Sequence, residues 1–282
     1  MLTVTNLHKT FNAGTVNEVY ALRDVSLDLP AGAFLVILGG NGSGKSTLLN
    51  AVAGSFRLDE GEIHLAGQNV TRWQEHRRAR LIGRVFQNPF TGTAPTMSIA
   101  ENLALAARRG QKRRLGWALP RKLKDELHDR VSQLRMGLED RLGNAIGSLS
   151  GGQRQALTLL MATWHKPALL LLDEHTAALD PKSAELVLRV TEEVITRYRL
   201  TTLMVTHSMQ QAAKLGDRIL IMHKGEVAYR FAGADKQRLG VDDLLARFED
   251  LRRREMLDET AAALLKETYI LVRGTGWAAG CR

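Results

Sequence analysis

The chain has 282 residues, of which 44% are hydrophobic, a size and composition that suit one large packed domain or a domain with an appendage. It has no run of about 20 apolar residues and no charged-then-apolar leader at its start, so we expect neither a membrane-spanning helix nor a signal peptide. Its net charge of +9 fits a nucleic acid, an anionic membrane surface or a nucleotide as partner, while its single cysteine excludes an intramolecular disulfide and favours a reducing cytosol.

The first part of the chain predicts short strands around one helix. The hydropathy pattern indicates strands at residues 2–5, 25–29, 33–38 and 61–65. Apolar residues then recur at helical spacing from Ser46 to Ala53, and Gly54 is placed to end that helix. A strand thus runs through a short loop into a helix.

That loop reads G-G-N-G-S-G-K-S and matches the phosphate-binding pattern G-x-x-x-x-G-K-[ST]. Glycine backbone N–H groups and a helix N-terminus cradle phosphates in such a loop, and the strand–loop–helix context favours this reading over an ordinary glycine-rich turn. Lys45 is placed to reach the outer phosphates, the Ser46 hydroxyl to bind Mg²⁺, and Thr47 to donate to an inner phosphate. The predicted nucleotide-binding residues here are Gly39, Gly40, Asn41, Gly42, Ser43, Gly44, Lys45, Ser46 and Thr47.

The segment from about residue 88 to residue 165 is rich in Arg, Leu and Ala at helical spacing, and we expect it to form a helical subdomain inserted into a sheet-containing core. Beyond it, strands are predicted at 168–172, 202–205 and 218–222, and a helix at 184–198. This alternation predicts an α/β fold with a mainly parallel sheet covered on both faces.

From about Val241 a new amphipathic pattern predicts a C-terminal helical extension over residues 241–272. The last ten residues, 273–282, contain three glycines, and we expect a flexible tail there. The predicted organisation is therefore a nucleotide-binding domain at residues 1–240, the extension and the tail.

Two adjacent carboxylates, Asp173 and Glu174, follow the apolar strand at 168–172. Ligands of open α/β sheets bind at the carboxyl ends of strands, so we expect Asp173 on the Mg²⁺ side and Glu174 to polarise the attacking water. Two acids at the end of a buried strand often have only a structural role. Here they follow the block L-S-G-G-Q, at Leu149–Gln153, at a spacing along the chain that favours a role in catalysis.

Three blocks follow one another along the chain: the glycine-rich loop, L-S-G-G-Q, and the apolar strand with its two acids. L-S-G-G-Q, called the signature below, is typical of one branch of P-loop ATPases. In this order the blocks resemble the nucleotide-binding subunit of an ATP-binding cassette (ABC) transporter over roughly residues 1–230. The resemblance implies a P-loop NTPase cassette with a mainly parallel sheet core, an antiparallel β subdomain, the inserted helical subdomain and the C-terminal helical extension. It also implies ATP hydrolysis, with ATP and Mg²⁺ as the bound groups.

The resemblance assigns roles to three further residues. His207 corresponds to a switch histidine that can donate to the γ-phosphate and hold the catalytic carboxylate and water in line. Gln87 corresponds to a glutamine that joins the core to the helical subdomain and senses Mg²⁺ and the attacking water. Phe11, with Tyr20 behind it, is the best match to the aromatic residue on which adenine stacks.

The signature residues form a second predicted anion site, because Ser150 is placed to cap the following helix while Gly151 and Gly152 expose backbone N–H groups ahead of Gln153. One chain cannot easily use both anion sites on the same γ-phosphate. The resemblance implies that two copies pack head to tail, each signature capping the nucleotide on its partner's loop. Asp180 corresponds to the loop that crosses this interface.

Two longer blocks, D-E-H-T-A-A-L-D-P at Asp173–Pro181 and the segment Phe86–Leu103, resemble bacterial ATPases of tryptophan/tyrosine-type uptake systems. His175 departs from the proline common at its position in the wider family. The partners implied are a second copy of the chain, integral membrane permease subunits and a separate substrate-binding protein. The implied location is peripheral, on the cytoplasmic face of the bacterial inner membrane.

Three alternatives stay open. An export or lipoprotein-extrusion ATPase shares the longer first hairpin at residues 12–19, although segment 141–147 lacks the acidic, glycine-flanked element of many exporters. A soluble non-transport ABC ATPase needs a coiled coil, a zinc site or a second cassette, and the sequence shows one cassette, no heptad repeat and one cysteine. The basic runs also lack the interleaved aromatic residues on which a single-stranded nucleic acid would stack, so no nucleic acid is expected as a partner. The intact residues Lys45, Asp173, Glu174 and His207 argue against a catalytically inactive binding module.

Overall fold

The computed structural model describes residues 1–110 and 119–256 and divides the chain into two compact units, Met1–Gln237 and Arg238–Arg282. In the second unit, residues 241–256 are helical. The rest of the predicted extension and the tail predicted at 273–282 lie outside the described residues. Within the described ranges, no helix is long and apolar enough to cross a membrane.

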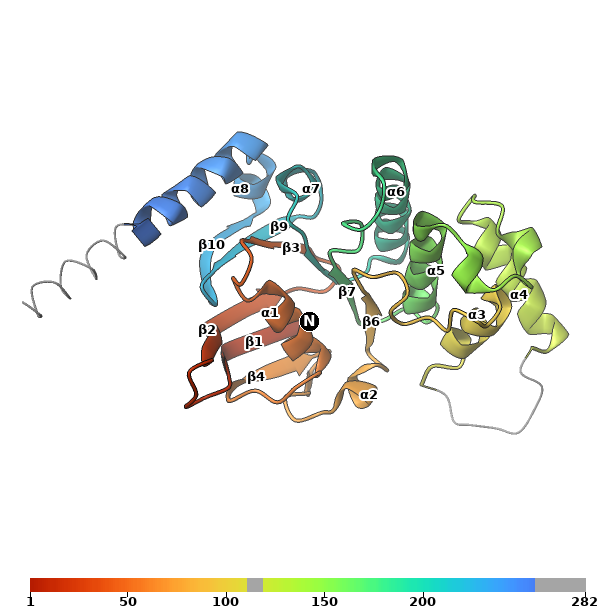
Figure 1. Cartoon of the computed structure of the whole chain (residues 1–282), viewed down its shortest axis with the longest axis horizontal. Helices are drawn as coiled ribbons and strands as arrows, with labels where there is room; N and C mark the ends of the chain where they lie inside the picture. Colours follow the sequence, from red (N-terminus) through yellow and green to blue (C-terminus); the bar gives the residue numbers. More distant parts are fainter. Residues whose placement is uncertain (111–118, 257–282) are drawn as a thin grey trace, which may run out of the picture. The chain divides into compact units, whose positions relative to one another are not determined.

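The first unit contains two sheets (Figure 1). The antiparallel sheet has the strand order β2-β1-β4-β5, made of β1 (Leu2–Phe11), β2 (Val19–Leu29), β4 (Glu60–Leu65) and β5 (Gln68–Asn69). The second sheet has the order β10-β9-β3-β8-β7-β6, made of β3 (Phe34–Gly39), β6 (Ile82–Val85), β7 (Leu169–Asp173), β8 (Thr202–Val205), β9 (Arg218–His223) and β10 (Glu226–Ala232). Its strands pair in parallel except β10 with β9. The predicted α/β fold is confirmed.

The helices of this unit are α1 (Lys45–Ala53), α2 (Glu75–Arg78), α3 (Ile99–Ala107), α4 (Arg121–Ser132), α5 (Gly151–Thr163), α6 (Pro181–Tyr198), α7 (Met209–Lys214) and α8 (Gly233–Gln237). Figure 1 shows α3, α4 and α5 together at the opposite end of the unit from the antiparallel sheet. All three lie within the segment predicted to be helical.

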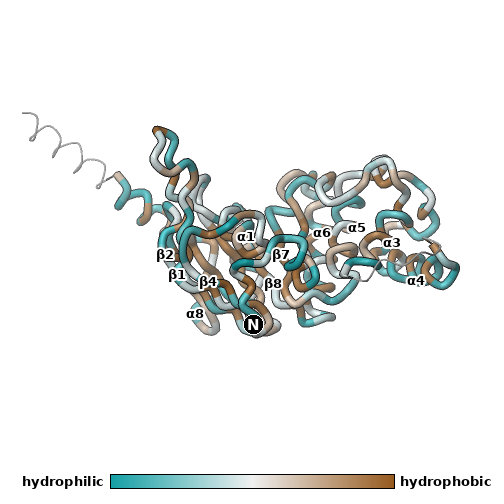
Figure 2. Tube along the Cα trace, turned by 90° about the horizontal axis from the view of Figure 1, so that it is seen from below, coloured by the Kyte–Doolittle hydropathy of each residue, from teal (hydrophilic) through white to brown (hydrophobic). Residues whose placement is uncertain are grey.

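One hydrophobic core joins the two sheets through α1. It includes Leu48, Leu49 and Val52 of α1 together with residues of β1, β3, β7 and β8, all nearly inaccessible to solvent. Figure 2 shows hydrophobic segments in the strands around α1. Each such buried aliphatic side chain stabilises the fold by about 1.5–3 kcal/mol, so this packing fixes α1, and with it the loop before α1, against the parallel sheet.

The sequence underestimates the extent of the sheets. β1 and β2 are longer than the strands predicted at 2–5 and 25–29, because Thr10 and Phe11 pair with Tyr20 and Val19 beyond the alternating segments. β6 and β10 were not predicted at all. β6 is only four residues long, and most of β10 is half-buried without a clear alternation, so neither has a strong period-two pattern.

Candidate functional site

The glycine-rich loop joins β3 to α1, as predicted. Gly42 and Gly44 have φ angles of 74° and 97°, and a Cβ atom on Gly44 would lie 2.5 Å from the carbonyl oxygen of Ala21. Both positions therefore need glycine, for conformation and, at Gly44, for space. Gly44 gives α1 no side-chain cap, so the N–H groups of the first helical turn are available to an anion.

Lys45 lies over this loop with 5% of its surface exposed, and its Nζ donates to the Gly40 carbonyl oxygen at 2.8 Å. Burial lowers the pKa of Lys45, and the charges of Glu174 and Asp173 act in the opposite direction. The ammonium group is thus close enough to both predicted acids to interact with them, on the side of the loop where a phosphate would need a cation.

Ser43 contributes a buried hydroxyl to the loop. Only 4% of the residue is exposed, and its Oγ has no hydrogen-bond partner within the described ranges. A buried polar group left unpaired costs about 1–3 kcal/mol, and native structures satisfy nearly all such groups. The loop therefore provides a polar contact that a phosphate oxygen can complete, which fits the predicted nucleotide.

The predicted metal ligands form a sparse set. In the part of the chain that the structure describes, no group of three His, Cys, Asp or Glu side chains could hold a metal ion. Mg²⁺ is usually bound through one or two protein oxygens plus substrate phosphates and waters. Ser46, at the start of α1, and Asp173, at the end of β7, supply oxygens of this kind, so the donor set fits Mg²⁺ bound together with a nucleotide.

Glu174 and His207 are brought together beside the carboxyl ends of β7 and β8. His207 Nε2 lies 2.7 Å from Glu174 Oε1, with the Glu174 side chain 11% exposed and that of His207 44% exposed. Glu174 has a φ of 45°, in the left-handed region that only a few per cent of non-glycine residues occupy. The pairing gives the carboxylate a fixed partner, as an acid that positions a water requires.

A hydrogen-bonded bridge that the sequence did not predict links the loops carrying these two residues. Gln211, in α7, donates from Nε2 to Thr176 Oγ1 at 3.2 Å and accepts at Oε1 from Thr206 Oγ1 at 2.8 Å. Thr206 directly precedes His207, and Thr176 follows Glu174 by two positions. No sequence pattern marks this bridge, because Thr206 and Gln211 are close in the chain but only folding brings Thr176 to them.

We expect Gln211→Leu to lower kcat for ATP about 10-fold with little change in KM, because the two loops lose their shared anchor and the Glu174–His207 pair loses alignment. Gln211→Glu is the matched control, since it keeps the shape and an acceptor for Thr206. Steady-state kinetics together with thermal unfolding test this, and a Leu variant with a raised KM but an unchanged kcat would contradict it.

Gln87 is exposed just beyond β6, and its neighbourhood is attached to α5. Gln155 donates from Nε2 to the Phe86 carbonyl oxygen at 2.9 Å. The Arg154 guanidinium lies 3.7 Å from the centroid of the Phe90 ring, a cation–π contact. The segment predicted to connect core and helical subdomain is therefore held by two consecutive side chains of the signature helix.

The signature residues begin α5 as predicted. The Ser150 side chain accepts from the Gln153 backbone N–H, and the Gln153 side chain accepts from the Ser150 N–H, which is a complete capping box. Gly151 and Gly152 follow as the first two helical residues. Both backbone N–H groups therefore belong to a helix N-terminus, the arrangement expected of an anion site.

The signature also packs against the start of α6, which the sequence did not predict. A Cβ on Gly152 would lie 2.8 Å from Ser183 Cβ, and one on Gly151 would lie 3.0 Å from the Leu179 side chain. Asp180 caps α6 by accepting from the Ser183 backbone N–H at 3.0 Å. The two predicted interface segments of one chain thus lie side by side.

Phe11 lies at the end of β1, where it pairs with Val19 of β2. Its ring packs edge-on against Phe56, with centroids 5.4 Å apart, so one aromatic neighbour that the sequence did not predict holds it in place. Two residues along β2, the carbonyl of Ala21 borders Gly44 of the loop. β2 therefore connects the predicted adenine contact to the predicted phosphate site.

The sequence profile described as ABC transporter matches residues 22–177, which include the loop, Gln87, the signature and both acids. The chain belongs to the ABC transporter family. This ABC cassette is accordingly an ATP hydrolase, as the resemblance implied. It is 39% identical to the tyrosine transport ATP-binding protein of Clostridioides difficile over 251 residues, covering 88% of this chain and 99% of that protein.

Other relatives extend the comparison. The cassette is 37% identical to the sulfate/thiosulfate import ATP-binding protein CysA of Nocardia farcinica and 32% identical to the methionine import ATP-binding protein MetN of Escherichia coli, in each case over 80% of this chain. It spans only 63% and 64% of those two proteins. A dimeric, post-hydrolysis structure of the cassette MJ0796 bound to ADP and Pi superposes with a TM-score of 0.71 at 27% identity, covering 82% of this chain and 98% of that one.

Proposed function

We propose that this chain is the MgATP-hydrolysing subunit of a bacterial ABC importer and that it acts as a head-to-tail dimer. The observation that carries the proposal is the Glu174–His207 pair at 2.7 Å, next to β7 and within electrostatic reach of Lys45. An inactive binding module needs the phosphate loop but not this pair. The pair therefore favours turnover in this chain, and family membership supports the reaction.

The nucleotide-binding roles follow from the loop. The backbone of Gly39–Ser46 and the start of α1 bind the phosphates, with Lys45 supplying the cation and Thr47 an inner-phosphate donor. Phe11 stacks on the adenine. Ser46, Gln87 and Asp173 would hold the Mg²⁺, and the cation would supply positive charge that neutralises the negative charge developing during hydrolysis.

The chemical roles belong to three side chains around the γ-phosphate. Glu174 accepts a hydrogen bond from the attacking water and orients it. His207 keeps the Glu174 carboxylate in place, as its 2.7 Å contact supports, and donates to the γ-phosphate. Gln87 senses the metal and the water from the segment tied to α5.

The dimer proposal explains the second anion site. Ser150, Gly151, Gly152 and Gln153 cap the nucleotide bound by the partner's loop, and Asp180 crosses the same interface. The contact between the signature and the start of α6 supports this assignment, because it places the two segments next to each other in one chain. The dimeric solved relative supports the stoichiometry.

Import of a small, amino-acid-like solute is the direction and substrate class we propose. The relatives named for sulfate/thiosulfate import and methionine import support the direction, and those named for tyrosine transport and methionine import support the substrate class. In this proposal the chain binds integral membrane permease subunits at the cytoplasmic face of the inner membrane, and a separate substrate-binding protein delivers the solute.

Mixing two inactive variants tests the shared site. A Ser150→Arg chain should still bind ATP through its own loop but hydrolyse it slowly, and a Lys45→Ala chain has the opposite defect. In a mixed dimer both defects fall on one site and leave the other intact. We expect the mixture to recover about a quarter of the parental ATPase rate if sites act independently, because random pairing makes about half the dimers mixed.

Each variant alone, at the same total concentration, is the control for that mixture. Light scattering of Glu174→Gln in ATP, with permease subunits present, provides a second measurement and should detect a dimer. A strictly monomeric protein under those conditions refutes the shared-site proposal and the importer with it.

A further inference from the structure

We propose that Arg84 is a positioning residue for Asp173. It holds one oxygen of the Asp173 carboxylate in place and partly neutralises the negative charge of that carboxylate at the Mg²⁺ site. The inference rests on the proposed function, since it concerns the same metal site. Nothing in the sequence motifs singles out Arg84, which lies in the unpredicted strand β6.

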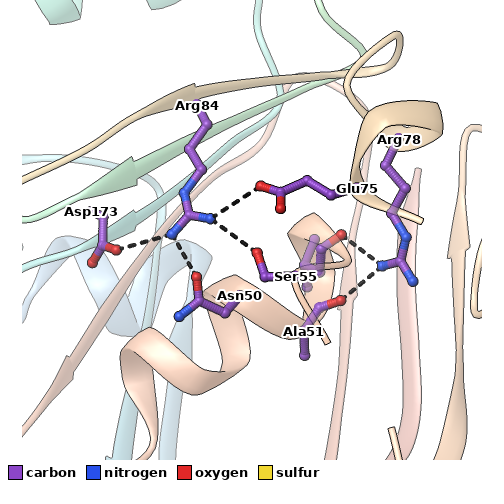
Figure 3. Close-up of polar contacts among 8 residues, drawn as sticks. Asn50, Ala51, Ser55, Glu75, Arg78, Arg84 and Asp173 are labelled. Atoms are coloured by element: carbon purple, nitrogen blue, oxygen red, sulfur yellow. Dashed lines mark hydrogen bonds and ion pairs between the residues drawn. The ribbon is translucent and has the colours of Figure 1, made fainter. Parts of the chain in front are cut away.

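The strand pairing brings the two residues together. β6 runs parallel to β7 with Arg84 in register with Leu171, two residues before Asp173. The Arg84 Nη2 lies 3.4 Å from Asp173 Oδ2 (Figure 3). The two side chains are only 13% and 16% exposed, so solvent and salt screen this ion pair much less than a surface pair.

Other groups hold the guanidinium in this place. Its Nη2 also donates to Asn50 Oδ1 at 2.6 Å and its Nη1 to Ser55 Oγ at 3.4 Å, while Glu75 lies 3.9 Å away (Figure 3). Its Cζ also lies 4.5 Å from the centroid of the Phe86 ring. The planar Arg84 guanidinium, held by contacts from α1, α2 and β6, can orient a carboxylate. The flexible ammonium group of a lysine could not do so.

This arrangement affects the metal site in two ways. Arg84 donates a hydrogen bond to Oδ2 of Asp173, so Oδ1 is the oxygen that stays available to Mg²⁺. Its positive charge also opposes a divalent cation bound at the same carboxylate, at a partly buried place where charges interact strongly. Because Mg²⁺ takes few protein ligands, the orientation and charge of this single carboxylate matter for both its affinity and its position.

Arg78 provides a matched structural comparison (Figure 3). It is 1% exposed, and among the residues that the structure describes its guanidinium donates only to backbone carbonyl oxygens, those of Ala51, Val52, Thr71 and Trp73. Burial lowers the pKa of Arg78 to about 10. It caps the C-terminal end of α1 and has no carboxylate to position, so its loss should affect folding alone.

The test compares Arg84→Met, Arg84→Lys and Arg78→Met with the parental chain. Calorimetry gives the ATP affinity in EDTA and in Mg²⁺, and steady-state kinetics gives kcat and the half-saturating Mg²⁺ concentration. For Arg84→Met we expect an unchanged affinity in EDTA, about 3- to 10-fold tighter Mg²⁺ binding from the lost repulsion, and about 10-fold lower kcat from the misplaced carboxylate. Arg84→Lys should keep the parental Mg²⁺ requirement but lose part of kcat.

Two results overturn the inference. One is a folded Arg84→Met chain whose Mg²⁺ requirement and kcat both match the parental chain. The other is an equal loss of ATP affinity with and without Mg²⁺ and a fall in Tm like that of Arg78→Met, which would assign Arg84 to folding only. A parental chain without Mg²⁺-dependent ATPase activity would instead contradict the proposed function, so the two failures are distinguishable.

Discussion

Glu174→Gln will reduce ATP turnover about 10²–10⁴-fold while leaving ATP affinity near the parental value, because the amide keeps the shape of the side chain but loses the basic oxygen that polarises water. The amide oxygen can still accept from His207, so the 2.7 Å contact and the local fold should survive. The variant should therefore accumulate with ATP bound. Single-turnover hydrolysis and nucleotide-binding calorimetry measure the two quantities separately.

Glu62→Gln is the matched control, since it makes the same chemical change on an exposed side chain of β4. It should hydrolyse ATP at the parental rate. If Glu174→Gln does so as well, Glu174 is not the catalytic acid.

Lys45→Ala will weaken ATP binding about 10- to 100-fold, the effect expected when one or more charge-assisted hydrogen bonds are removed from a partly buried site. Lys45 is the buried cation of the phosphate loop, within reach of both acids. Unlike Glu174→Gln, this change should reduce binding itself, so calorimetry at increasing ATP concentration detects it directly.

Lys124→Ala, on an exposed position of α4, is the corresponding control and should bind ATP as the parental chain does. An unchanged affinity of Lys45→Ala would show that the glycine-rich loop does not bind the phosphates.

Contiguous motifs account for what the sequence could predict of the fold and the site. The loop at Gly39–Ser46 and the buried run before Asp173 each combine a local pattern with a secondary-structure transition, so both could be placed on the correct elements. The helix predicted at 184–198 and the strand predicted at 202–205 appear for the same reason, with α6 beginning slightly earlier.

What the sequence could not predict depends on tertiary contacts. β6 carries Arg84 between apolar neighbours, and nothing in this local sequence indicates its role. The role becomes clear only from the pairing of β6 with β7, which brings Arg84 close to Asp173. Gln211 and Phe56 support predicted site residues from distant positions in the chain. Such supporting residues have no characteristic spacing, because their partners are chosen by the fold and not by the local chain.

The close approach of Gly152 to Ser183 has a consequence for association. Since the two segments are already packed against each other within one chain, a partner would meet a preorganised surface and would not have to order two independent loops. In the proposed dimer, less of the binding free energy is then lost to ordering. A side chain at position 152 would separate the signature from the start of α6. It would thereby hinder the dimer from forming around ATP without removing any atom that touches the nucleotide.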